Sequence, residues 1–409
     1  MKSSRIWPTI GLMVVLATVM YGTTMPTALY SEYERQFGFS LLTITVVYAV
    51  YAVGVLTALI AFGRWSDVLG RRPMLAIGVG CAAASDVVFL LADSSASLVV
   101  ARVVSGLSAG VFVGTAAVAI VEMAQGPLAK RAPLLASLAT MGGLGLGPVA
   151  ASLLANWAPE PLRTTYWVHL GLLVAAGLVI AMVPETRERS HPRERLGMTP
   201  LTVPIEIRGF FLRSAVLGFA GFAVLGLFTA LAPTIAARFT GVDSGIGQTM
   251  LVVSVMAGSL VGQIVGRVFG DHLAELTAVA AMIAGMALLA ASLLIGRWEL
   301  LAGAGSVGGF GQGMAFARGL AGIATGAPAD RKAATTSAYF VITYVAISIP
   351  VVVEGLLAQI VGVRTAGLVF AAAVSLLAFV AGVLARRSNG GFSSTPPITS
   401  VAVTDSNRR

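Results

Sequence analysis

Three residues that can carry a charge or a proton lie within long apolar runs: Asp86, Arg102 and Glu354. An arginine inside a bilayer costs about 2.5–3.5 kcal/mol, so Arg102 needs a partner. Asp86 lies seven residues before Asp93 at the end of its run, which places it roughly 10 Å deep. Arg102 lies about as deep in the next run. We therefore predict an Asp86–Arg102 pair, which either only neutralises the two charges or also exchanges protons.

Glu354 follows closely behind Pro350 within an apolar run and is a candidate second protonatable site. Glu122 falls at the end of its run, where we expect it at the membrane interface.

Residues for metal binding or covalent catalysis do not gather in this sequence. His169, His191 and His272 fall at an outer helix start, in a linker and in a loop, without metal-ligand spacing or a nucleophile–base pair. Cys81 is the only cysteine, which excludes a disulfide framework. A phosphate-binding G-x-x-x-x-G-K-[ST] loop is absent from the sequence. We therefore expect neither an enzyme, nor a metal or cofactor, nor direct use of ATP.

A short polar island, Gly63-Arg64-Trp65-Ser66-Asp67-Val68-Leu69-Gly70-Arg71-Arg72-Pro73, separates two long apolar runs. Two glycines allow a tight turn, and Asp67 can cap a helix end or pair with a neighbour. Arg71 and Arg72 cannot enter a bilayer cheaply. The alternative interpretation is a positively charged loop that only sets the topology.

The composition indicates a chain solvated by lipid. Hydrophobic residues make up 57% and charged residues 11%, against roughly 25% charged residues in a soluble domain; the mean hydropathy is +0.88. The formal charge is +9, but the basic residues lie in short gaps between apolar runs and not on one face. They are therefore interpreted as topology signals, and no nucleic-acid partner is predicted.

Apolar runs of about 20 residues predict membrane helices, and on this criterion the sequence contains twelve. The first follows Lys2 and Arg5 and is too long for a signal-peptide core, so we expect it to be retained. The fold class is therefore an all-α membrane protein. The predicted spans are 6–29, 42–62, 73–92, 96–121, 133–156, 165–184, 211–236, 245–266, 273–295, 299–324, 335–360 and 366–386.

Basic residues predict the orientation and the domain limits. With the N-terminus inside, 20 of the 27 basic residues fall on one side and five on the other, so both termini are predicted to be cytoplasmic. The stretch around 185–210 is rich in Pro and alternating charge and reads as a linker. The predicted parts are a six-helix bundle at 1–184, this cytoplasmic linker, a second bundle at 211–386 and a disordered tail at 387–409.

Internal similarity indicates that the two bundles are duplicates. A shift of 203 residues places Gly63-Arg64 on Gly266-Arg267 and Val104-x-Gly106-x-x-x-Gly110 on Val307-x-Gly309-x-x-x-Gly313. A shift of 202 places Thr27-Ala28-Leu29 on Thr229-Ala230-Leu231 and Pro148 on Pro350. Four matches in order at nearly one offset predict repeated six-helix units.

The polar island matches G-x-x-x-D-x-x-G-R-[RK], and by this motif the chain resembles the major facilitator superfamily. The resemblance implies two pseudo-symmetric six-helix bundles, related as parallel repeats, that rock around a central cavity lined chiefly by helices 1, 4, 7 and 10. It also implies a conformational latch formed by Gly63, Asp67, Gly70, Arg71 and Arg72.

Two further features of the resemblance concern the latch and the proton. Arg102 begins an R-x-x-x-G motif that the family links to proton coupling. The counterpart loop at 266–272 keeps only Gly-Arg, so any latch is asymmetric. We therefore predict that Asp67→Asn impairs transport more than any change in that loop; equal sensitivity of both loops would contradict this.

The stretch Gly142-Gly143-Leu144-Gly145-Leu146-Gly147-Pro148-Val149-Ala150-Ala151 resembles the helix-5 motif of drug/proton antiporters, with the final glycine pair replaced by alanines. Gly143, Gly147 and Pro148, like Gly106 and Gly110, are predicted to form close helix contacts. The resemblance favours proton-coupled efflux of a small amphipathic solute or drug. A proton-coupled uptake symporter and a non-transporting receptor or scaffold are the alternatives.

Polar residues on the cavity-lining helices predict a substrate cavity. An unpaired Arg318 there would favour anionic or zwitterionic substrates, and its alternative is to extend to the inner surface. The expected partners are a small-molecule substrate, protons and the lipid bilayer, with a monomer in the plasma (inner) membrane. The predicted cavity residues are Tyr21, Thr24, Gln312, Arg318 and Tyr344.

Overall fold

A computed structural model describes residues 6–63, 65–186, 197–198, 201–241, 245–328 and 331–388. Arg64, residues 187–196 and 199–200 of the predicted linker, and all but two residues of the predicted tail lie outside the described residues. The first half of the chain forms α1 (Trp7–Thr24), η1 (Met25–Leu29), α2 (Tyr30–Phe37), α3 (Leu41–Ala49), α4 (Tyr51–Phe62), α5 (Trp65–Leu69), α6 (Arg71–Leu90), α7 (Ser95–Met123), α8 (Pro127–Trp157) and α9 (Pro161–Met182).

The second half begins earlier than predicted, because a short turn of helix and the first residues of α10 precede position 211. Its last helix extends through Ser388, two residues past the predicted end of the bundle. The elements are η2 (Ile205–Ile207), α10 (Arg208–Ala230), α11 (Ala232–Phe239), α12 (Gly245–Val265), α13 (Asp271–Ile295), α14 (Trp298–Gly326), α15 (Lys332–Val361) and α16 (Val363–Ser388).

Every predicted membrane span coincides with a helix or a pair of consecutive helices. Eleven of these segments, among the described residues, are long and apolar enough to cross a membrane. The twelfth, α14, is 29 residues long but less apolar, because nine glycines and Gln312 lower its mean hydropathy. Its length still exceeds the roughly 20 residues that a bilayer core requires.

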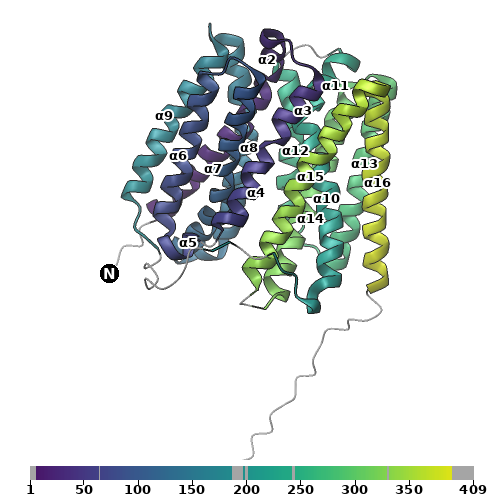
Figure 1. Cartoon of the computed structure of the whole chain (residues 1–409). Helices are drawn as coiled ribbons and strands as arrows, with labels where there is room; N and C mark the ends of the chain where they lie inside the picture. Colours follow the sequence, from purple (N-terminus) through teal and green to yellow (C-terminus); the bar gives the residue numbers. More distant parts are fainter. Residues whose placement is uncertain are drawn as a thin grey trace, which may run out of the picture.

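The helices run roughly parallel to one another, and the two halves of the chain lie side by side (Figure 1). The first nine α-helices form one half, here the N-half, and α10 to α16 form the C-half. Helix α5 lies at one end of the molecule, and α2 and α11 lie at the opposite end (Figure 1). We refer to these as the α5 end and the α2 end.

The first helix of each half is interrupted at the same place. In the N-half, α1 changes to a tight 3-10 turn over Met25–Leu29 and continues as α2 to Phe37. In the C-half, α10 ends at Ala230 and α11 continues to Phe239. Pro26 and Pro233 each lie in the break, where proline lacks the N–H that an uninterrupted helix needs. The Leu29 and Phe37 positions correspond to Leu231 and Phe239 at the shift of 202 seen in the sequence.

The repeated glycine pairs make the same contact in both halves. A Cβ added to Gly106 or Gly110 of α7 would collide with the backbone carbonyls of Tyr51 or Val55 in α4. A Cβ added to Gly309 or Gly313 of α14 would collide with the carbonyls of Val255 or Ser259 in α12. Each glycine pair therefore allows two helices to approach backbone to backbone.

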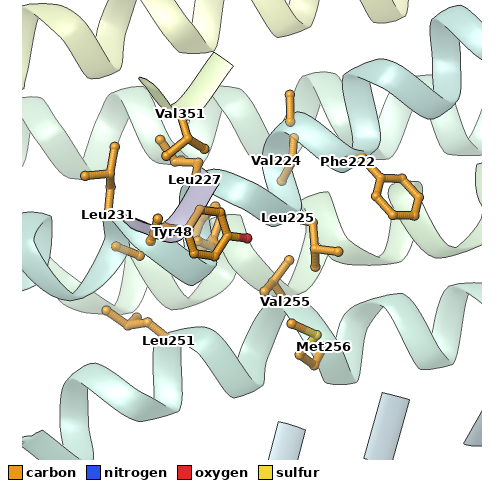
Figure 2. Packing of buried hydrophobic residues seen from close by; sticks show 14 of the residues in the cluster. Tyr48, Phe222, Val224, Leu225, Leu227, Leu231, Leu251, Val255, Met256 and Val351 are labelled. Atoms are coloured by element: carbon orange, nitrogen blue, oxygen red, sulfur yellow. The ribbon is translucent and has the colours of Figure 1, made fainter. Parts of the chain in front are cut away.

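The two halves share one hydrophobic core toward the α2 end. Tyr48 of α3 belongs to the same buried cluster as Leu225 and Leu227 of α10 and Val351 of α15, and Figure 2 shows its ring among these side chains. Farther along, the rings of Tyr51 in α4 and Tyr344 in α15 lie 6.5 Å apart. The halves are therefore packed together at this end.

Helices α8 and α12 also join the halves along most of their length. The hydroxyl of Ser137 in α8 donates to the side-chain oxygen of Gln263 in α12. Nearer the middle, Gly145 faces the side chain of Met256. Toward the α2 end, Gly245 begins α12 beside Ser152 of α8.

Candidate functional site

Arg71 is the centre of a polar network at the α5 end of the N-half. Its guanidinium forms ion pairs with Asp67 at 3.0 Å and with Glu122 at the end of α7 at 3.1 Å. It also donates to the Ser66 hydroxyl at 2.6 Å. The Arg71 side chain is only 8% exposed, so the network holds its charge away from water by direct pairing.

Glu185, just after α9, closes the network from a fourth direction. Its carboxylate accepts the backbone N–H groups of Arg71 and Arg72, at 2.8 and 3.0 Å, and these are the first free N–H groups of α6. Gly70, which precedes α6, has φ +101° and lies against the same carboxylate. A side chain there would be strained and would displace Glu185.

The latch residues predicted from the sequence thus lie together, and further residues join them. Arg72 also donates to the Ala181 carbonyl of α9 at 2.7 Å, and Gly63 forms the end of α4. The network recruits Glu122, which we expected only at the membrane interface, and Glu185, which fell in the predicted linker. Its hydrogen bonds and ion pairs connect α5, α6, α7 and the end of α9, all in the N-half.

The predicted Asp86–Arg102 pair is wrong, because Asp86 pairs with His169 of α9. The Asp86 carboxylate lies 2.7 Å from the His169 Nδ1, and both side chains are buried. The other ring nitrogen, Nε2, lies 3.1 Å from the Thr18 carbonyl of α1. Since a carbonyl only accepts, Nε2 carries a proton, and one further proton lies between Nδ1 and the carboxylate.

The depth estimate for the predicted pair was nevertheless sound. The neighbouring hydroxyl of Ser85 donates to the carbonyl of Ala101 at 2.9 Å, so the two helices meet at this level. The side chains of Asp86 and Arg102 leave the contact in different directions. The sequence prediction placed His169 at an outer helix start, because the predicted span begins at 165. Helix α9 begins four residues earlier, at Pro161, so His169 lies eight residues into the helix, a depth comparable to that of Asp86.

Arg102 is fully buried and contacts backbone carbonyls and aromatic rings. Its NH1 donates to Thr23 O at 2.7 Å, and its NH2 lies 3.5 Å from Tyr48 O. The guanidinium carbon lies 4.6 Å from the centre of the Tyr51 ring and 5.8 Å from that of Tyr48. Its Nε has no hydrogen-bond partner within the described part of the chain. Cation–π contacts replace the predicted carboxylate.

Glu354, the other candidate protonatable residue, is 3% exposed on α15. Its Oε2 has no hydrogen-bond partner among the described residues, and its Oε1 lies near Gly367 of α16. It lies within the C-half, between α15 and α16. Its role as a second protonatable site stays a prediction.

The five predicted cavity residues do not gather at one site. Tyr21 stacks near the His169 ring, with centroids 5.3 Å apart, and Thr24 donates to the Leu144 carbonyl of α8 at 2.8 Å. Gln312 is buried against Gly221 of α10.

Tyr344 and Arg318 complete the predicted set. Tyr344 meets Tyr51 of the other half. Of the two alternatives for Arg318, the unpaired arginine in the cavity is wrong, because Arg318 forms an ion pair with Asp271 at the start of α13.

A cavity of about 200 Å³ lies between the halves at the α2 end, and none of those five residues lines it. Its N-half wall includes Thr27, Tyr30 and Glu34, next to the break in the first helix. Its C-half wall includes polar and charged side chains of α11 and α12, among them Arg238 and Thr249. Pro148 of α8 also contributes, so the antiporter-like stretch borders this space.

The antiporter-like stretch itself packs tightly on the first helix. A Cβ at Gly143 would collide with the Ala17 carbonyl of α1, and one at Gly147 would collide with the Tyr21 carbonyl. Pro148 lies within α8. The packing role predicted for these glycines therefore matches the contacts that they make.

Comparison with known proteins identifies relatives among transporters. A multidrug transporter MdfA of Edwardsiella ictaluri is 30% identical over 207 residues, which cover 48% of this chain and 49% of the relative. A triacylglyceride transporter of Mycolicibacterium hassiacum is 25% identical over 225 residues, 54% of this chain and 39% of the relative. The chain thus matches half or less of the length of these relatives.

Among solved structures, a bacterial homologue of the human lysosomal transporter Spinster, in an inward-facing and unoccupied conformation, has the same fold. It aligns with a TM-score of 0.71 at 14% identity and covers 95% of this chain and 98% of its own. The family model of the Major Facilitator Superfamily matches residues 10–295. With its multiple candidate membrane helices and paired bundles, the chain belongs to the Major Facilitator Superfamily.

Proposed function

We propose that this protein exports a small amphipathic solute in exchange for protons, by alternating access between its two halves. The observation that carries the proposal is the packing of α8 on α1. Gly143 and Gly147 bring the α8 backbone against carbonyls of α1 immediately before α1 breaks at Thr24. The same stretch resembles the helix-5 motif of drug/proton antiporters, and one relative is a multidrug transporter.

This contact suits a movement in which helices slide without losing their packing. Small residues leave a smooth surface, so one helix can shift along another without side chains interlocking. Pro148 removes one backbone hydrogen bond from α8 and makes bending there less costly. The first helix can then change its angle at the break while it remains in contact with α8.

We assign the proton to the Asp86–His169 pair in place of the predicted Asp86–Arg102 pair. The proton between Nδ1 and the carboxylate can belong to either group, so the pair is neutral overall in both arrangements. Gain of another proton would leave a buried positive charge beside the first helix. Because Nε2 contacts the Thr18 carbonyl of α1, such a change would act directly on the helix that must move.

Within the described part of the chain, two tyrosines also lie near this pair. Tyr21 of α1 and Tyr166 of α9 are close enough to interact electrostatically with Asp86. The Tyr166 hydroxyl lies 3.0 Å from that of Tyr33 in α2. Arg102 of α7 is the nearest basic group along that helix, and its guanidinium is directed to Thr23 and Tyr48.

We further propose that the α5 end faces the cytoplasm, as the distribution of basic residues favours. The packed α2 end would then face outward, and the conformation would be inward-facing. The latch network would stay within the N-half in this state and engage the C-half when the α5 end closes.

The test is transport by right-side-out membrane vesicles with an imposed pH gradient, preloaded with amphipathic dyes of either charge. Outward movement of a dye driven by inward protons is the expected result. Inward movement would show uptake, and the absence of substrate-linked proton flux with a panel of amphipathic dyes would favour a receptor.

Two variants separate the proton role from general damage. Asp86→Asn keeps the shape of the side chain and is expected to abolish the dependence of flux on the pH gradient. Asp93→Asn is the matched control, because Asp93 lies on the exposed turn after the same helix and contacts only Ser94 and Ser97 in the described part of the chain. Unchanged pH dependence in Asp86→Asn would refute the assignment.

A further inference from the structure

Arg102 is a buried cation without a carboxylate partner in the described part of the chain. It is 1% exposed, and its hydrogen bonds lead to two backbone carbonyls, of which the one to Tyr48 is long at 3.5 Å. A guanidinium has five N–H donors, and the Nε donor has no partner. Carbonyl dipoles and ring faces reduce the cost of burying the charge, but they do not neutralise it.

A second unused donor lies close by. The hydroxyl of Tyr30 is buried without a hydrogen-bond partner among the described residues, and Tyr30 is near enough to Arg102 to interact with its charge. Asp86, the carboxylate that the sequence predicted as the partner of Arg102, is paired with His169. Two donors of one site are thus left without an acceptor.

The position of the two donors places them beside the contact between the halves. Tyr30 lines the cavity of about 200 Å³ at the α2 end. Arg102 is covered by Tyr51, whose hydroxyl interacts with that of Tyr344 in the C-half. Alternating access requires this contact to open. Opening would uncover the guanidinium from the side of the cavity.

We propose that Arg102 and Tyr30 bind the anionic group of an amphipathic substrate, a carboxylate or phosphate monoester, when the contact between Tyr51 and Tyr344 opens. An anion would accept from the free Nε and from the Tyr30 hydroxyl and would neutralise the buried charge. The apolar part of the substrate would lie along the wall formed by Ile44, Pro148 and Val252. This inference rests on the proposed transport function and adds the charge class of the substrate.

Other arginines of the described chain fit this role less well. Arg318 already has a carboxylate partner in Asp271. Arg238 lines the same cavity but is exposed to solvent, where water weakens its attraction for an anion. Arg102, and not Arg318, is therefore the arginine that we propose binds an anion.

The test compares probes that share a twelve-carbon chain and differ in charge. Wild-type protein in phosphatidylcholine nanodiscs is titrated below micellar concentrations with dodecanoate, dodecyl phosphate and dodecyltrimethylammonium, and binding is followed by thermal unfolding. Both anions are expected to bind at least about 10-fold more tightly than the cation. Preference between the two anions distinguishes carboxylate from phosphate, and equal binding of all three probes would overturn the proposal.

Variants locate the binding at Arg102. Arg102→Gln is expected to weaken anion binding about 10-fold and to leave cation binding unchanged. Tyr30→Phe removes only a hydroxyl and is expected to weaken anion binding about threefold. If Arg102→Gln does not fold, this variant alone tests the anion site. Arg364→Gln is the matched control, because Arg364 also stacks on an aromatic ring, Phe239, at 5.4 Å.

The outcomes separate this site from the transport function. Two results would overturn the anion site. One is an unchanged affinity for the anions in both Tyr30→Phe and a folded Arg102→Gln. The other is an equal loss of affinity for the anions and for the cation in these variants. Anion binding at Arg102 without any proton-linked transport would leave the site intact and refute the exporter. Proton-driven dye export together with equal binding of anions and cation would support the exporter and overturn the anion site.

Discussion

The two halves of the molecule keep the same packing but differ in their polar chemistry. Gly106 and Gly309 make equivalent backbone contacts, and both first helices break at the same repeat position. In contrast, the positions that correspond to Asp86, Arg102 and His169 at a shift of 203 are Leu289, Gly305 and Ala372.

The close approach of two helix backbones depends on helix geometry, and both copies of a duplicated fold must retain that geometry. A buried charged residue, in contrast, is needed only in the copy in which it has a role. The difference therefore assigns the N-half as the part that carries the proposed proton and anion chemistry.

The α5 end shows the same contrast in its ion pairs. In the N-half, Arg71 of α6 pairs with Glu122 of α7, and in the C-half Asp271 of α13 pairs with Arg318 of α14. The helices correspond, but acid and base have exchanged places. The Arg71 side chain is 8% exposed, whereas that of Asp271 is 93% exposed. Water competes for the second pair far more than for the first.

The largest expected difference between the halves follows from this exposure. Arg71→Gln leaves Glu122 and Asp67 without their shared guanidinium and is expected to lower the free energy of unfolding by about 3 kcal/mol. Arg318→Gln is its counterpart and is expected to cost less than about 1 kcal/mol. Denaturant unfolding of the purified variants measures both values. Equal losses would contradict the idea that only the N-half network is structurally important.

An intermediate effect is expected where the halves are alike. Gly106→Val and Gly309→Val each force a branched side chain against a backbone carbonyl, Tyr51 O or Val255 O. Each is expected to destabilise the protein by about 1–3 kcal/mol. Thermal unfolding should show similar losses in the two variants. Gly80→Val is the control, since a Cβ at Gly80 meets no atom within 4 Å; a loss confined to one half would break the structural equivalence.

The smallest expected effect concerns the loops themselves. Asp67→Asn weakens one of several contacts to Arg71, so its stability cost is expected to stay below about 1 kcal/mol. Its transport defect should still exceed that of Asp271→Asn, because the proposed latch acts through the buried network. Initial rates of efflux of a transported dye compare the two variants. Equal rates in both would remove the asymmetry that the sequence predicts.

Depth along the helices could be predicted from the sequence, and so could the local packing signals. Counting residues from the ends of apolar runs placed Asp86 and Arg102 at one level, and the contact between Ser85 and Ala101 confirms it. The glycine motifs of α7 and α8 likewise predicted close helix contacts, because a glycine has no side chain to hold two helices apart. The span 299–324 was also found, although α14 is less apolar than the other spans.

The partners of the charged residues could not be predicted in the same way. Residue counting gives the depth of a side chain, but its direction around the helix axis depends on how that helix is rotated against its neighbours. A rotation of one residue, about 100°, changes which helix a side chain meets. For this reason Asp86 meets His169, Arg318 meets Asp271, and Glu122 and Glu185 join the network around Arg71.

The amino-acid sequence alone therefore determined that this protein lies in a membrane, which segments cross it and at what depth each charge sits, because hydropathy and helical rise act locally along the chain. Only the tertiary structure decided that Arg102 meets no acid among the described residues and that a histidine completes the buried pair. Those outcomes depend on the rotation and packing of helices that are distant in the sequence, and on which of several possible partners each charge meets.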